Sequence, residues 1–133
     1  MSHLIDTNVA IYLRDQDREI IIRLFALDDA PKLSIISLVE LEGGVVAKPD
    51  LATVRRKNLD TLLAKVVVAQ FDRAVVEEYR GIVEAIGFSR RRILDRLIAA
   101  TAIANDLTLI TTNGVDFRDI PGLKLEVWPT PAQ

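Results

Sequence analysis

Short runs of Ile, Val and Leu alternate with longer helical patterns along this chain, and this alternation constrains the fold most. The expected strands are nearly continuous apolar runs, as is typical of strands buried on both faces. They lie at residues 4–6, 33–36, 66–70, 107–111 and 124–127. Helices are expected between them, at residues 8–14, 19–27, 39–46, 51–64, 74–85 and 93–104. This order predicts an α/β fold with an open, mostly parallel five-stranded sheet and helices on both faces. Almost no helix precedes the last strand, so its direction stays open.

The length of 133 residues and the 50% apolar content predict one domain, spanning residues 1–133, with a single real core. The apolar runs are far shorter than the ~20 residues that cross a bilayer, so no membrane association is expected. The N-terminus has no basic region followed by a long apolar stretch, and therefore no signal peptide is expected.

The residue types present restrict any metal site to oxygen ligands. There is no cysteine, and the only histidine is His3, so disulfides, thiolate ligands and multi-histidine zinc sites are excluded. Oxygen ligands favour Mg²⁺ or Mn²⁺. The net charge of −2 argues against a general coat for nucleic acid, and any basic surface must be local. Two local basic clusters exist, at residues 55–57 and at Arg90, Arg91 and Arg92.

Four carboxylates are expected at one edge of the predicted sheet. Asp6 ends the first strand, and Glu40 lies four residues beyond the second strand, in the first turn of the helix that follows. Asp95 lies near the start of the helix that leads into the fourth strand, and Asp116 follows that strand. Parallel sheets bind ligands at the carboxyl ends of their strands, where crossover helices begin. The topology therefore brings the four acids together.

Three of these acids also have purely structural interpretations. Asp6 can cap the helix that follows it. Ser37 and Glu40 fit the S-x-x-E capping box, in which the glutamate reaches back to a free backbone N–H. Asp116 can be a turn residue after the Asn113-Gly114 pair. Each of these interpretations competes with a functional one when the residue is considered alone.

Asp95 is harder to explain as a structural residue, because the stretch "ILDRLIAATAIA" is apolar on almost every side. An ionised carboxylate there costs several kcal/mol unless it is paired or bound to a metal. The structural alternative is a buried ion pair with Arg91, Arg92 or Arg96. Crowded acids raise one another's pKa values, and a divalent ion removes that penalty. Such a hard-oxygen site can activate water for attack on a phosphodiester.

The stretches that carry these acids resemble the PIN-domain ribonucleases, in particular the VapC-type toxins of type II toxin–antitoxin modules. "LIDTNVAIYL" is similar to the family's opening strand with its first acid, Asp6. "SIISLVELEGGV" resembles the segment that bears the second acid, Glu40. "LDRLIAATAIANDLTLITTNGVDF" is similar to the third block, which supplies Asp95, Thr111, Asn113 and Asp116. The sequence departs from the family at "FSRRRILD", where members often carry a glycine-containing loop.

The resemblance implies a PIN-like three-layer fold with strand order 3-2-1-4-5 and a metal-dependent endoribonuclease. Mg²⁺ or Mn²⁺ is the implied cofactor, and single-stranded or structured RNA is the implied substrate. The implied metal ligands are the four acids, and Thr111 and Asn113 complete the catalytic set. The resemblance further implies a cytoplasmic homodimer that is silenced by a small VapB-type antitoxin. The main alternative function is a non-catalytic PIN-like module that binds RNA or protein. A phosphatase or receiver domain is disfavoured, because no second acid closely follows Asp6.

Two surfaces are expected to make contacts with other molecules. Arg90, Arg91 and Arg92 precede the helix of Asp95, so they are candidates for binding RNA phosphates beside an acidic site. Helices 19–27 and 51–64 are strongly apolar, and in VapC-like proteins this region grips an antitoxin helix.

Overall fold

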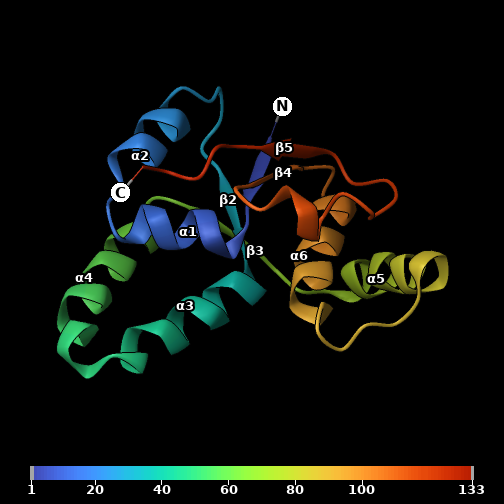
Figure 1. Ribbon diagram of the computed structural model, residues 1–133, viewed down its shortest axis with the longest axis horizontal. Coiled ribbons are helices and arrows are strands. Elements are labelled where there is room, and N and C mark those ends of the chain that lie inside the picture. Colours follow the sequence, from blue (N-terminus) through green and yellow to red (C-terminus); the bar gives the residue numbers. More distant parts are fainter. Residues whose placement is uncertain (1, 133) are drawn as a thin grey trace.

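The computed structural model describes residues 2–132 and contains one five-stranded sheet (Figure 1). All neighbouring strands are parallel, and the spatial order is β3-β2-β1-β4-β5. The strands are β1 (His3–Ile5), β2 (Lys32–Ser34), β3 (Val67–Ala69), β4 (Thr108–Thr111) and β5 (Leu125–Val127). The predicted order is confirmed. The direction of β5, which the sequence left open, is parallel to β4.

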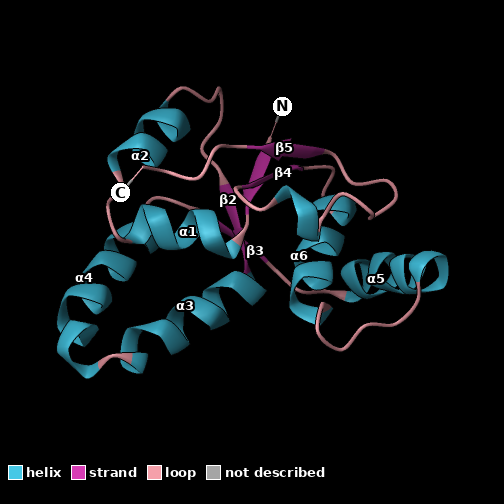
Figure 2. Ribbon diagram, in the orientation of Figure 1, coloured by secondary structure: helices cyan, strands magenta, loops and turns pink. Residues whose placement is uncertain are grey.

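Helices cover both faces of this sheet, as predicted (Figure 2). One side carries the first four helices, and α5 and α6 lie together on the other side (Figure 1). The helices are α1 (Thr7–Arg14), α2 (Arg18–Phe25), α3 (Ile35–Ala47), α4 (Ala52–Leu63), α5 (Arg73–Ile86) and α6 (Ile93–Ala104). The described residues also contain two short 3₁₀ helices, η1 (Pro49–Leu51) and η2 (Gly114–Asp116). No helix within residues 2–132 is both long and apolar enough to cross a bilayer.

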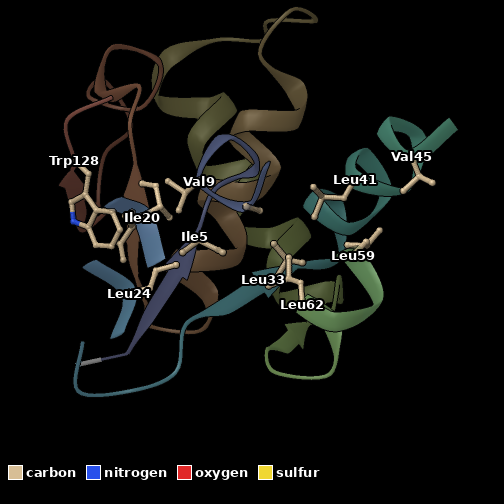
Figure 3. Close-up of a cluster of buried hydrophobic side chains, with 12 residues drawn as sticks. Ile5, Val9, Ile20, Leu24, Leu33, Leu41, Val45, Leu59, Leu62 and Trp128 are labelled. Atoms are coloured by element: carbon tan, nitrogen blue, oxygen red, sulfur yellow. The ribbon is translucent and has the colours of Figure 1, made fainter. Parts of the chain in front are cut away.

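The core is divided in two by the sheet. Successive strand residues point to opposite faces, so Ile5 and Ile110 pack against α1–α4, whereas Leu4 and Leu109 pack against α5 and α6. Figure 3 shows the first of these clusters, in which Ile5 and Leu33 of the sheet lie among side chains from the surrounding helices. The buried apolar residues thus form two clusters, one on either side of the sheet.

The predicted end of the second strand was wrong. Ile35 and Ile36 belong to α3, not to β2, and α3 starts four residues before the predicted helix. The reason is local, because the Ser34 side chain accepts a hydrogen bond from the backbone N–H of Ser37 and caps the helix. The edge strands also differ from the expectation of burial on both faces. Val67 in β3, a strand at the edge of the sheet, is for example 61% exposed.

Candidate functional site

The Asp6 carboxylate lies at the carboxyl end of β1 and is only 3% exposed. One oxygen, Oδ1, accepts a hydrogen bond from the backbone N–H of Val9 at 2.8 Å and so caps α1. The other oxygen, Oδ2, accepts from the Thr111 hydroxyl of β4 at 2.5 Å. That hydroxyl itself accepts from the Asn113 backbone N–H at 2.9 Å. The helix-cap interpretation of Asp6 is thus correct, and it coexists with a second contact that connects Asp6 to Thr111.

Glu40 is held by a threonine that the sequence analysis did not single out. The Thr7 hydroxyl donates to Glu40 Oε1 at 2.7 Å and lies 2.9 Å from the Ser37 hydroxyl. Because Ser34 caps α3, Glu40 lies in the second turn of the helix and not in the first, and the proposed Ser37–Glu40 capping box is wrong. The signal for Thr7 was its position directly after Asp6, which places it beside the same edge.

Asp116 ends η2 and is held on both oxygens. Asn113 donates through Nδ2 to Asp116 Oδ2 at 2.6 Å. Arg92 donates through Nη1 to Asp116 Oδ1 at 3.2 Å and to the Asp116 carbonyl at 3.3 Å. Thr111 and Asn113 therefore each contact one of the four acids, and their catalytic role stays a prediction.

Asp95 lies in the first turn of α6, is half-buried, and accepts no hydrogen bond within the part of the chain that is described. The buried ion pair considered for it is not formed. Arg92 donates to Asp116 instead, and the buried Arg96 donates to the Gly87 carbonyl at 2.8 Å. Arg91 is exposed. Asp95 is thus the one acid of the four without a donor among residues 2–132.

The pKa values show that the four carboxylates interact. Burial raises the pKa of Asp6 to about 6, against the lowering effect of its hydrogen bonds from Thr111 and Val9. The charges of Asp95 and Glu40 raise this pKa further. Burial also raises the pKa of Asp95, as do the charges of Asp116 and Glu40, while Arg92 opposes them. We call Asp6, Glu40, Asp95 and Asp116 the carboxylate cluster, because the charges of these acids act on the pKa values of Asp6 and Asp95.

The oxygen ligands of the cluster suit a hard divalent cation. Among residues 2–132, no three acidic or histidine side chains are placed to hold one ion together. Mg²⁺, however, keeps several waters and is usually bound through only one or two carboxylates. The half-buried Asp95 carboxylate, which has no donor among residues 2–132, has the chemistry of such a ligand. The oxygen-only chemistry of the four acids therefore fits a Mg²⁺ or Mn²⁺ ion.

The basic clusters have different environments. Arg90 and Arg91 are exposed beside the start of α6, and only Arg92 of this group contacts the carboxylate cluster. In the other cluster, Arg55 donates to the Gly44 carbonyl at 2.8 Å. Its neighbour Arg56 forms ion pairs with Glu42 and Asp60. These two arginines hold α4 against α3, and so their structural role differs from that of Arg90 and Arg91.

A mainly apolar groove lies away from the carboxylate cluster, between α1, α2 and α4. It encloses about 410 Å³. Its apolar lining includes Leu24, Phe25 and Leu62, with Asp28 and Lys65 among the charged residues that line it. Phe25 is 82% exposed, which is a large apolar surface to leave in water. Helix α2 and the second half of α4 therefore bound a surface that is suited to an apolar partner.

Comparison with known proteins yields one family and several similar structures. The family model described as "PIN domain" matches residues 3–123. Ribonuclease VapC2 of Rickettsia felis is 31% identical over 134 residues, which cover 96% of this chain and 98% of that protein. The Rickettsia felis VapBC2 complex bound to a promoter DNA fragment contains a chain that is 28% identical, with a TM-score of 0.84 and coverage of 96% and 99%.

Two further structures are similar to this chain. A toxin–antitoxin complex from Klebsiella pneumoniae contains a chain that is 27% identical, with a TM-score of 0.74 and coverage of 97% and 100%. In DNA-bound VapBC from Salmonella typhimurium, the similar chain has a TM-score of 0.85, with coverage of 96% and 98%. At 21% identity, that last likeness concerns the fold alone.

Proposed function

The chain belongs to the PIN domain family, as a homologue of the VapC ribonucleases, and on this premise we propose a metal-dependent endoribonuclease that works at the carboxylate cluster. The whole chain acts as a single PIN domain in this proposal. Its substrate is RNA, and its cofactor is Mg²⁺ or Mn²⁺. In the cell it is the toxic component of a toxin–antitoxin pair.

The observation that carries this proposal is the environment of Asp95. Its carboxylate is half-buried and receives no hydrogen bond among residues 2–132, and the charges of Asp116 and Glu40 raise its pKa. A carboxylate without a donor or an ion pair is destabilising in a purely structural role. A divalent cation would compensate this charge and that of its neighbours. Asp95 and Asp6 are thus the principal proposed ligands, and Glu40 and Asp116 complete the site.

The protein's own groups orient these ligands. Thr111 and Val9 hold the two oxygens of Asp6, and Thr7 holds Glu40. The Asn113 side chain donates a hydrogen bond to Asp116, and its backbone N–H donates to the Thr111 hydroxyl oxygen. When bound, a divalent ion supplies an activated water and neutralises the charge that develops on the phosphate. These contacts keep the carboxylates in place before the ion and the RNA arrive, which lowers the reorganisation needed for reaction.

The change Asp95→Asn tests the proposal. It should abolish Mn²⁺ binding and RNA cleavage and leave the fold intact, because it removes one of several repelling charges in the metal-free protein. Calorimetric titration with Mn²⁺, a cleavage assay on RNA and thermal unfolding measure the three quantities. Asp119→Asn is the matched control, since that exposed carboxylate lies outside the cluster.

Two results would contradict this assignment of Asp95. The first is an Asp95→Asn protein that cleaves RNA at the normal rate. The second is a loss of stability by about 3–5 kcal/mol, which is typical of breaking a buried ion pair.

The partner of this proposal is a VapB-type antitoxin. The similar Klebsiella pneumoniae structure is described as a toxin–antitoxin complex. In our chain, the groove beside α2 is lined mainly by apolar residues, and one of them, Phe25, is largely exposed. An amphipathic antitoxin helix would bury these side chains as spaced apolar anchors. The acidic Asp28 and Asp29 at the groove suit a basic residue on that helix.

The proposal also includes a homodimer in the cytoplasm, as the family resemblance implies. Light scattering of the purified protein at several concentrations tests the dimer. Fractionation of cells that express the protein at its natural level tests the location.

A further inference from the structure

Arg92 occupies a position inside the carboxylate cluster that the proposed function does not use. It is the last residue before α6, and its guanidinium reaches the acid after β4, 24 residues along the chain. One nitrogen, Nη1, contacts both Oδ1 and the backbone carbonyl of Asp116, at 3.2 and 3.3 Å. The Arg92 and Asp116 side chains are 30% and 32% exposed, so this ion pair is partly shielded from water.

The charge of Arg92 acts on more than Asp116. It also opposes the rise in the pKa of Asp95, so the guanidinium lies within electrostatic range of two of the four acids. No other arginine or lysine among residues 2–132 forms an ion pair with Asp6, Glu40, Asp95 or Asp116. A guanidinium stays protonated at every ordinary pH, so its charge cannot be removed by titration.

We propose that Arg92 is the internal counter-ion of the carboxylate cluster, and that a divalent cation competes with Arg92 for Asp116. This inference rests on the proposed function only in assuming that a divalent cation binds the cluster. In the metal-free protein, Arg92 offsets part of the repulsion among the acids. In the metal-bound protein, the same positive charge repels the ion, and the contact between Nη1 and Oδ1 gives way.

The neighbouring contacts are arranged so that Asp116 keeps its orientation after this exchange. Asn113 is neutral and holds the other oxygen, Oδ2, at 2.6 Å, so it need not move when Arg92 leaves. Only Oδ1 is then released toward the cluster.

The test compares three variants without RNA. Arg92→Gln removes the charge, Arg92→Lys keeps it, and Arg91→Gln removes an equal charge from the exposed neighbour. We expect Arg92→Gln to bind Mn²⁺ about tenfold more tightly than the wild type, since a cation near the ion weakens its binding by more than this when unscreened. Arg92→Lys should remain near the wild-type affinity because it keeps the positive charge. Arg91→Gln should also remain near it at about 0.15 M salt, because the exposed charge of Arg91 is largely screened there. Calorimetric titration with Mn²⁺ measures these affinities.

A second readout separates a counter-ion from a residue that merely positions Asp116. As a counter-ion, Arg92 stabilises the metal-free protein, so Arg92→Gln should melt at a lower temperature without metal and gain more from Mn²⁺ than the wild type gains. If Arg92 instead positions Asp116 for the ion, the variant gains less from Mn²⁺ and binds it more weakly. That result, or unchanged affinity with an unchanged metal-free melting temperature, overturns the inference.

Failure of the proposed function gives a different pattern. If neither the wild type nor Arg92→Gln binds Mn²⁺ at millimolar concentration, the metal site and this inference both fail. If only Arg92→Gln binds Mn²⁺, Arg92 does compete with the ion, and it is the metal dependence of the natural protein that is contradicted. Circular dichroism of each variant confirms that the fold is retained, and Arg92→Lys provides the comparison in which the charge persists.

Discussion

The Asp6 carboxylate receives a hydrogen bond on each oxygen, from two segments that are far apart in the sequence. The backbone N–H of Val9 belongs to the helix that Asp6 caps, and the Thr111 hydroxyl belongs to a neighbouring strand. Both contacts favour the charged form of Asp6, yet burial outweighs them and raises its pKa to about 6. The ionised form of Asp6 therefore destabilises the folded protein at neutral pH, and a bound cation can offset this effect.

This cost predicts how the stability of the metal-free protein depends on pH. The folded pKa of Asp6 is raised from 3.8 to about 6, so its favourable contribution is complete below pH 3.8 and is lost as the pH rises through 6. Replacing Asp6 by Asn removes this titration, and the difference in unfolding free energy between the variant and the wild type should grow from pH 4 to pH 7. The shift corresponds to a change on the order of 3 kcal/mol. Urea unfolding at several pH values measures it.

Added metal supplies the control for this prediction. Mg²⁺ or Mn²⁺ at millimolar concentration should raise the melting temperature of the wild type at pH 7, because a ligand that binds the folded state stabilises it. The rise should be smaller at pH 5, where Asp6 is largely protonated. A pH-independent difference between the two proteins, with no thermal shift from metal, would contradict the role of Asp6.

Helix α6 and the loop before it form the element that brings chemistry to the edge of the sheet. The buried side chains Ala99, Ala100 and Ala102 are small, so the helix backbone packs closely between the sheet and α5. Arg96 fixes the loop by donating to the Gly87 carbonyl, and Arg92 fixes its end on Asp116. Arg90 and Arg91 are left exposed on this anchored loop, beside the first turn that carries Asp95.

We expect Arg90 and Arg91 to contact RNA phosphates. An acidic cluster repels a polyanion, and the net charge of −2 supplies no general attraction, so local cations are needed. The double variant Arg90→Ala, Arg91→Ala should bind RNA more weakly across sequences, and the slope of log affinity against log salt should fall by roughly one to two units. Its Mn²⁺ affinity should barely change. Binding of a short RNA without added metal, measured by fluorescence anisotropy at four salt concentrations, checks this.

An unchanged slope would exclude these two arginines as the phosphate contacts. Lys57 would then be the remaining candidate from the other basic cluster, because Arg55 and Arg56 are engaged with Gly44, Glu42 and Asp60.

At the scale of the whole molecule, the two hydrophobic clusters lie under different sets of helices. The cluster that includes Ile5, Leu33 and Trp128 supports helices α1–α4 and the groove between them. The other cluster supports α5 and α6. Arg23 of α2 lies over the Trp128 ring, at 5.9 Å from its centroid, which helps to hold α2 against the end of the chain.

The exposed Phe25 provides the test of this groove. The change Phe25→Asp should abolish co-purification with a co-expressed VapB-type antitoxin, because a charge replaces an apolar anchor. RNA cleavage by the isolated variant should persist, since Phe25 lies in the groove and not among the acids. Val46→Asp is a matched control, as that side chain is exposed on α3 and does not line the groove. A variant that retains the antitoxin, or a wild type that is non-toxic and purifies without any small partner, would contradict the proposal.

The sequence alone determined the parallel α/β architecture and the four candidate acids. Its alternation of short apolar runs with helical patterns leaves few other topologies, and a parallel sheet brings the ends of its strands to one edge. Asp6, Glu40, Asp95 and Asp116 could therefore be grouped although they lie far apart along the chain. The metal-binding role of these acids stays a prediction.

The contacts among these side chains were decided only by the tertiary structure. The hydrogen bond of Thr7 to Glu40 spans 33 residues, and that of Arg92 to Asp116 spans 24. Local periodicity reports which face of a helix is buried, but it does not report which polar group from another segment lies opposite. The start of α3 was mispredicted because either Ser34 or Ser37 can cap a helix, and the structure uses Ser34. The polar partners of a site thus follow from packing, whereas its position follows from topology.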